Sequence, residues 1–89
     1  MKVLPKTLRP FSRTKTFAHD SVPKKLLQNH DTRAGIWAVL NVENGEIQYT
    51  IEDNEVVILS KNVPGVIEPT VTYHIKPLGK ASFYIEFYK

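Results

Sequence analysis

The chain of 89 residues lacks cysteine altogether. Neither a disulfide framework nor a thiolate metal site can therefore form, so a bound metal ion would need histidine and carboxylate ligands. Long apolar runs are also missing, because none approaches the roughly 18 residues that span a membrane. The basic N-terminus lacks the continuous apolar core of a secretory signal. We therefore expect a cytoplasmic protein with no membrane partner.

Acidic residues are scarce in the first third of the chain. Residues 1–33 hold eight lysines and arginines against two acids, whereas residues 34–89 hold four lysines against seven acids. A basic arm on an acidic body either binds nucleic acid or lies against the body. The second interpretation is favoured, because the basic residues are spread among proline, threonine and apolar residues. We expect one domain, residues 1–89, in which residues 1–17 form a basic, extended arm.

Helix signals are nearly absent. Only Ser21-Val22-Pro23, followed by Leu26 and Leu27, predicts a short helical turn, because serine can cap a helix and proline suits its first turn. Elsewhere short apolar runs alternate with turn residues, which is typical of a small all-β sandwich or barrel. The expected strands cover residues 11–17, 34–42, 46–53, 55–60, 65–69, 71–76 and 81–89.

Three groups of turn residues separate these strands. Asn44-Gly45 predicts a hairpin, because both central residues of a type I′ turn need a positive φ. Pro64-Gly65 fits the central pair of a type II turn. Pro77-Leu78-Gly79 predicts a hairpin that joins the last two strands.

That last hairpin would bring polar side chains onto one face. A three-residue turn would place His74 opposite Tyr84 and diagonal to Glu86, and a five-residue connection would place Glu86 directly opposite. A two-residue turn would put them on different faces. Histidine and carboxylate together suit zinc or another first-row divalent ion, and His30 is the natural third ligand. From the spacing alone, a simple hydrogen bond between His74 and Glu86 on a solvated face is favoured over a metal site.

Two longer segments carry a more specific signal. Together, FSRTKTF…SVPKKLLQNHDTRAGIWAVLNVENGEIQY and VPGVIEPTVTYHIKPLGKASFYIEFY resemble the small TehB/YeaR-like domain family. The most specific pieces are residues 30–35, 64–74 and 83–88. The resemblance implies a cupin-like double-stranded β-helix. Such a domain occurs alone, or ahead of a methyltransferase in some tellurite-resistance proteins.

The resemblance also bears on the metal site. Residues 64–74 are similar to a second cupin motif, in which a glycine turn and a proline precede a metal-binding histidine. The first cupin motif departs from the pattern, because residues 34–42 contain neither histidine nor glutamate. A reduced site for a divalent zinc or iron ion is implied, with the ligands His30, His74 and Glu86.

Further residues near this site each have two interpretations. Arg33, beside His30, either binds a small anion or small molecule or forms a surface ion pair with Asp31, and the ion pair is favoured. Glu68 is an additional candidate ligand. The tyrosines at positions 49, 84 and 88 either line a pocket or pack in the core.

The resemblance implies a metal-binding, cupin-like domain in resistance to tellurite, other oxyanions or chemical stress, with a binding or accessory role. The alternative is a non-haem iron or zinc enzyme acting on a small molecule, since two histidines and a carboxylate resemble a facial triad. An enzyme is less favoured, because no general base exists besides the ligands. The chain has no methyltransferase motif. Nucleic acid is not an expected partner, and a homodimer through an edge strand would suit so small a barrel.

Overall fold

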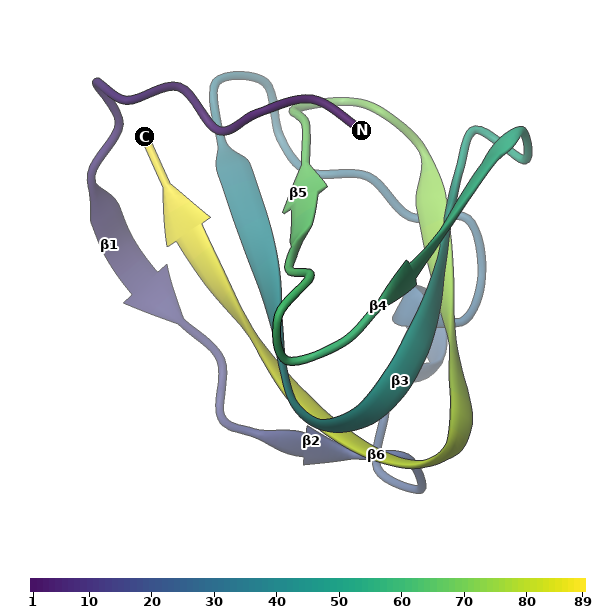
Figure 1. The fold of residues 1–89 in the computed structure, drawn as a ribbon. Coiled ribbons are helices and arrows are strands. Elements are labelled where there is room, and N and C mark those ends of the chain that lie inside the picture. Colours follow the sequence, from purple (N-terminus) through teal and green to yellow (C-terminus); the bar gives the residue numbers. More distant parts are fainter.

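The computed structural model describes residues 1–89 and contains one antiparallel sheet (Figure 1). Its strands are β1 (Pro10–Arg13), β2 (Phe17–Ala18), β3 (Trp37–Ile51), β4 (Glu55–Leu59), β5 (Gly65–Ile67) and β6 (Tyr73–Tyr88). The main order is β1-β6-β3-β4, while β2 also pairs with β6 and β5 with β3. The only helical element is the 3-10 turn η1 (Lys24–Leu26). The all-β prediction with one short helical turn is confirmed, and the sheet is open rather than a closed barrel.

The structure has no helix with the length and hydropathy needed to cross a membrane. Around η1, the predicted cap is wrong. Pro23 is extended and η1 has no side-chain cap. The Ser21 hydroxyl instead accepts a hydrogen bond of 2.8 Å from the backbone N–H of Ala18. Leu26 is buried and supplies the apolar contact that holds the turn to the body.

Two long strands replace the four strands and two hairpins that were predicted. β3 continues through Asn44-Gly45, and β6 continues through Pro77–Gly79, while the two strands pair antiparallel from end to end. The register shifts twice, between Val42 and Glu46, so the Asn-Gly pair lies in a bulged bend and not in a hairpin. Gly45 does have a positive φ, of 74°. The residue type therefore identified the local dihedral but not the direction of the chain beyond it.

The bend folds the sheet over on itself and creates the core. β3 and β6 curve together, so that both halves of each strand enclose a shared interior (Figure 1). Along β6, alternate residues are buried on both sides of the bend: Tyr73, Ile75, Ala81, Phe83 and Ile85. This is the period of two that a half-buried strand requires. Each large apolar side chain buried here contributes roughly 1.5–3 kcal/mol.

Gly65 does not act as the predicted turn glycine. The reversal before β5 is made by Ser60 and Val63, which exchange backbone hydrogen bonds of 3.2 and 3.0 Å. Gly65 has no positive φ and is buried at the start of β5. A Cβ atom there would lie 2.6 Å from Leu59 Cδ1. Gly65 is thus needed for close packing between strands rather than for a turn.

The basic arm lies against the body. β1 and β2 both pair with β6, and the Thr14 and His19 N–H groups donate 2.8 Å hydrogen bonds to Ile85 and Ala81. Before β1, the Met1 sulfur accepts a hydrogen bond from the Val66 N–H of β5, and Arg9 exchanges backbone hydrogen bonds with Lys89, just after β6. The backbone groups of the arm are therefore engaged by the sheet, as the second interpretation of the charge asymmetry expected.

Candidate functional site

The three predicted metal ligands do not meet. Because β6 does not reverse at Pro77–Gly79, His74 and Glu86 lie in different halves of one strand, opposite Thr50 and Val39. No group of three histidine, aspartate or glutamate side chains in the structure is arranged to hold a metal ion. His30, His74 and Glu86 therefore do not fit a shared metal centre, and the hairpin geometry on which that site depended is absent.

His74 and Glu86 instead make local polar contacts. His74 Nδ1 lies 3.3 Å from Asn29 Oδ1 and 3.6 Å from Asp53 Oδ1. Glu86 Oε1 accepts a 3.1 Å hydrogen bond from the Tyr88 hydroxyl. Since the neighbouring residues of β6 at odd positions are buried, both side chains project from the outer face of the sheet.

His30 is held quite differently, by its backbone. Its N–H donates to the Tyr73 carbonyl and its carbonyl accepts from the Tyr73 N–H, both at 2.8 Å. The His30 ring meets the Tyr73 ring edge-on, with centroids 5.9 Å apart. Thr32 adds a hydrogen bond of 3.1 Å from its hydroxyl to the Glu68 carbonyl. The segment around His30 is thus fixed to the sheet although it belongs to no strand.

The residues after Thr32 form a tight turn that ends this segment. The Ile36 N–H donates to the Arg33 carbonyl at 3.1 Å, and Gly35 has a φ of +81°. A hydrogen bond of this span with positive φ at the third residue defines a type II turn, which favours glycine there. The exposed Arg33 therefore occupies the first position of a rigid turn.

An open groove of about 560 Å³ lies beside this segment, and we call it the His30 groove. One wall comes from β1 and β6, through Phe11, Ser12 and Phe87, and η1 contributes Lys25. The opposite wall comes from residues 30–36, namely His30, Asp31, Thr32, Arg33 and Ile36.

A second, inner cavity of about 170 Å³ adjoins the groove. The two share the lining residues Lys25, His30, Thr32 and Phe87, so the cavities lie side by side. The rest of the inner cavity is lined by Phe17, Pro23, Leu26, Ile85, Tyr73 and Thr14. Burial, and secondarily the Asp31 carboxylate, raise the pKa of Tyr73, so its phenol keeps its proton at neutral pH.

The cations of the His30 groove have no acidic partner. The expected ion pair between Arg33 and Asp31 is not formed, and Lys25 is also unpaired. The only ion pairs join Met1 to Glu55, Lys2 to Glu68 and His74 to Asp53. The groove therefore holds two unpaired cations, Lys25 and Arg33, against one carboxylate, Asp31. Such a surface attracts a small anion.

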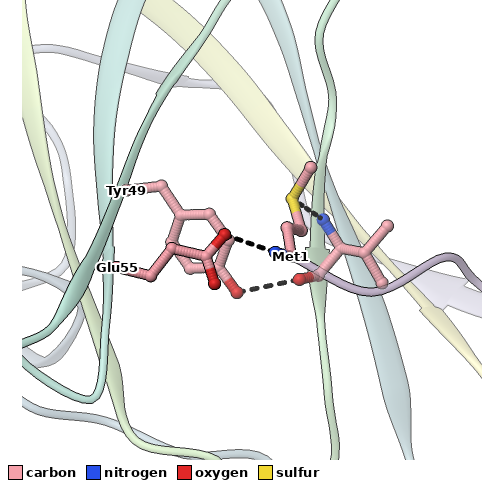
Figure 2. Close-up of polar contacts among 4 residues, drawn as sticks. Met1, Tyr49 and Glu55 are labelled. Carbon is pink, nitrogen blue, oxygen red and sulfur yellow. Dashed lines mark hydrogen bonds and ion pairs between the residues drawn. The ribbon is translucent and has the colours of Figure 1, made fainter.

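A third cavity has the opposite charge. This acidic groove of about 420 Å³ is lined by Glu52, Glu55 and Glu68 with Met1, Lys2, Ile51 and Val71. Figure 2 shows how the chain's own N-terminus enters it: the Met1 amino group pairs with Glu55, and the Met1 sulfur accepts from the Val66 N–H at 3.2 Å. The Val66 carbonyl accepts a 2.8 Å hydrogen bond from the Tyr49 hydroxyl. Glu68, the additional predicted ligand, lies 3.9 Å from Lys2 Nζ.

Sequence reasoning found part of the His30 groove and missed the rest. It identified His30 and the alternative of an anion at Arg33, but not Lys25 or the inner cavity. Lys25 directly precedes the buried Leu26 in the only helical turn. This position was the one feature of the sequence that could have indicated a role for Lys25 in the groove. The apolar residues of the inner cavity could be recognised as core residues, but not as the walls of a space.

Comparison with known proteins extends this description. A search of the curated proteins found no match. Among solved structures, a protein from Escherichia coli (strain K12) superposes with a TM-score of 0.90 at 17% identity, covering 100% of this chain and 97% of that one. TehB from Haemophilus influenzae gives a TM-score of 0.82 at 20% identity, over 93% of this chain. This chain spans only 32% of TehB.

Both structural likenesses establish a shared fold. The family model supplies the assignment, because the TehB-like domain matches residues 12–85. This range includes half of β1, the His30 segment, both long strands up to Ile85 and the bend between their halves. The chain therefore belongs to the TehB-like domain family.

Proposed function

We propose that this chain is a cytoplasmic anion-binding module that serves resistance to tellurite, related oxyanions or similar chemical stress, as a binding or accessory domain. One observation carries the proposal. Lys25 and Arg33 both line the His30 groove, and neither forms an ion pair within the chain. An anion entering the groove would find two cations whose charges are otherwise compensated only by solvent.

The chemistry of the two cations suits an oxyanion. Arginine presents a planar fork of N–H donors that matches carboxylate or other oxyanion oxygens, and lysine adds a mobile point charge. The phenyl groups of Phe11 and Phe87 form part of the wall. Apolar walls displace water and strengthen the attraction between a bound anion and its cations. His30, which lines both the groove and the inner cavity, offers a further ring nitrogen.

Family membership supports the link to resistance. One similar structure is named TehB, and the family carries that name. Because this chain spans a third of TehB or less, the activity of the whole protein is not transferred to it. The resemblance implied a cupin-like fold. That the open, folded sheet of this chain is related to the cupin fold stays a prediction. The proposal needs no metal ion, since His30, His74 and Glu86 do not fit a common centre.

Isothermal titration calorimetry tests the proposal with sodium tellurite, selenite, sulfate and phosphate. We expect Arg33→Ala or Lys25→Ala to weaken anion binding about tenfold or more, because a charge-assisted hydrogen bond contributes about 1.5–3 kcal/mol. Lys24→Ala is the matched control. This substitution removes the same charge from the same turn as Lys25→Ala, but Lys24 does not line the groove.

Two results would overturn the proposal. The first is that none of the four anions binds, and no carboxylate probe binds either. The second is that Lys24→Ala weakens binding as much as Lys25→Ala, since the net charge would then matter and the groove would not.

A further inference from the structure

The two cavities beside His30 differ in chemistry although they share four lining residues. The outer groove has the cations Lys25 and Arg33, whereas the inner cavity is lined mostly by the apolar side chains of Phe17, Leu26 and Ile85. A tetrahedral or pyramidal inorganic anion would occupy the outer groove alone. The apolar inner space would then contribute nothing to its binding.

The size of the inner cavity indicates what would fill it. Its volume is about 170 Å³. An engineered protein cavity of about 150 Å³, lined by leucine, isoleucine and phenylalanine, stays dry and accepts benzene. The inner cavity therefore has room for one ring or a branched aliphatic group of similar size.

Both threonine hydroxyls of the inner cavity are engaged by the chain. The Thr14 hydroxyl donates to the Lys15 carbonyl at 2.7 Å and accepts from the Ile85 N–H at 3.0 Å. The Thr32 hydroxyl donates to the Glu68 carbonyl at 3.1 Å. The side chains of Phe17, Leu26 and Ile85 offer no hydrogen bond to a charged or strongly hydrated group, which would lose its hydration against them.

We infer that the His30 groove takes an amphipathic monocarboxylate, whose carboxylate meets Lys25 and Arg33 while an apolar group of benzene size enters the inner cavity. This inference rests on the proposed anion site and names its ligand class. His30 and Phe87, which line both cavities, would flank the bond between the two parts of the ligand. A pocket with apolar walls and a few placed polar groups is typical of small-molecule sites.

The test compares acetate with phenylacetate by titration calorimetry, since the two share a carboxylate and differ in the ring. We expect phenylacetate to bind at least about tenfold more tightly, because burial of the ring removes apolar surface from water. Arg33→Ala should weaken both ligands by the same factor. Lys24→Ala should leave both unchanged.

Variants that fill the inner cavity separate its contribution from that of the groove. Phe17→Trp adds volume at a half-buried edge strand, and Leu26→Phe adds it at the 3-10 turn. Either should abolish the advantage of phenylacetate over acetate while tellurite binding stays the same. Nuclear Overhauser contacts between the phenyl protons and the Ile85 methyl groups of the wild-type protein test the same point without any substitution.

The outcomes distinguish this inference from the proposed function. If acetate and phenylacetate bind equally and both depend on Arg33, the ligand class is wrong and the anion site stands. If phenylacetate binds tightly without Arg33, or without contacts to Ile85, it binds elsewhere and the inference fails. If neither carboxylate nor any inorganic anion binds, both the inference and the proposed function fail.

Discussion

The His30 groove and the acidic groove are similar in size but differ in how their charges are balanced. Their volumes are about 560 and 420 Å³. In the acidic groove, the Met1 amino group pairs with Glu55 and Lys2 pairs with Glu68. In the His30 groove, Lys25 and Arg33 have no such partner. Two of the three carboxylates of the acidic groove are thus paired within the chain, whereas neither cation of the His30 groove is, so the His30 groove is the better candidate for an ionic ligand.

Both grooves depend on the bend that folds β3 and β6, so the largest expected effect comes from breaking it. A Cβ atom at Gly45 would lie 2.2 Å from the Lys80 carbonyl oxygen, and φ is +74°. We expect Gly45→Ala to reduce the free energy of unfolding by about 2–4 kcal/mol, through overpacking and dihedral strain. Urea denaturation measures this loss.

Gly79→Ala is the matched control for that prediction. Gly79 has a φ of +78° but no atom within 4 Å of an added Cβ. We expect a loss of only about 1 kcal/mol, from the dihedral alone. Equal losses for the two variants would show that the close approach at Gly45 does not constrain the bend.

Two buried tyrosines, Tyr73 and Tyr49, should respond alike to alkaline pH. The pKa of Tyr73 is raised by burial and by Asp31, and that of Tyr49 by burial, Tyr73, Glu68 and Glu55. Since the unfolded tyrosines ionise near pH 10, the unfolded state binds fewer protons above that pH. Stability is thus fully present below about pH 10 and falls, by about 1.4 kcal/mol per pH unit per tyrosine, towards the folded pKa.

Chemical denaturation between pH 8 and 11.5 measures this slope. Tyr73→Phe removes one of these contributions and should make the decline shallower, while it keeps the ring contacts with His30 and Tyr49. A decline that is the same in wild type and Tyr73→Phe would show that the phenol ionises freely in the folded protein.

The smallest expected changes in the free energy of unfolding come from removing single charges, either paired or unpaired. Glu55→Gln removes the partner of the Met1 amino group and should cost about 0.2–1 kcal/mol, as exposed ion pairs do. Glu52→Gln, in the same groove but without an ion pair, should cost less. Lys25→Ala should leave the free energy of unfolding within about 0.5 kcal/mol, because no partner is lost. A larger loss for Lys25→Ala would mean that its charge is used by the fold and not kept for a ligand.

The predicted and observed structures agree where a property is local. The apolar positions of residues 71–76 and 81–88 alternate, and alternate side chains are buried in the structure. The helical turn was found at Pro23 and Leu26, and the positive φ at Gly45 followed from the Asn-Gly pair. Family resemblance was also readable, since it depends on residue types along the chain.

The disagreements share one cause, which is pairing between distant strands. A positive φ at Gly45 or Gly79 is compatible with a hairpin and also with a bulge. The choice was made by continuous pairing of β3 with β6, between residues far apart in sequence. Because the chain forms no hairpin at Gly79, His74 and Glu86 lie in separate halves of one strand. The strand pairing on which the metal site was predicted is therefore absent.

The amino-acid sequence by itself determined the strand class, the alternation that selects the core and the excess of basic residues before position 34. Only the tertiary structure decided which charges are neighbours. Met1 pairs with Glu55 and Lys2 with Glu68, whereas Arg33 forms no ion pair with Asp31, only two residues away in the sequence. The physical reason is that the alternation of apolar residues and the preferred backbone dihedrals each depend on only a few neighbouring residues. The balance of charge at a groove depends instead on distances that the bent pair of long strands sets.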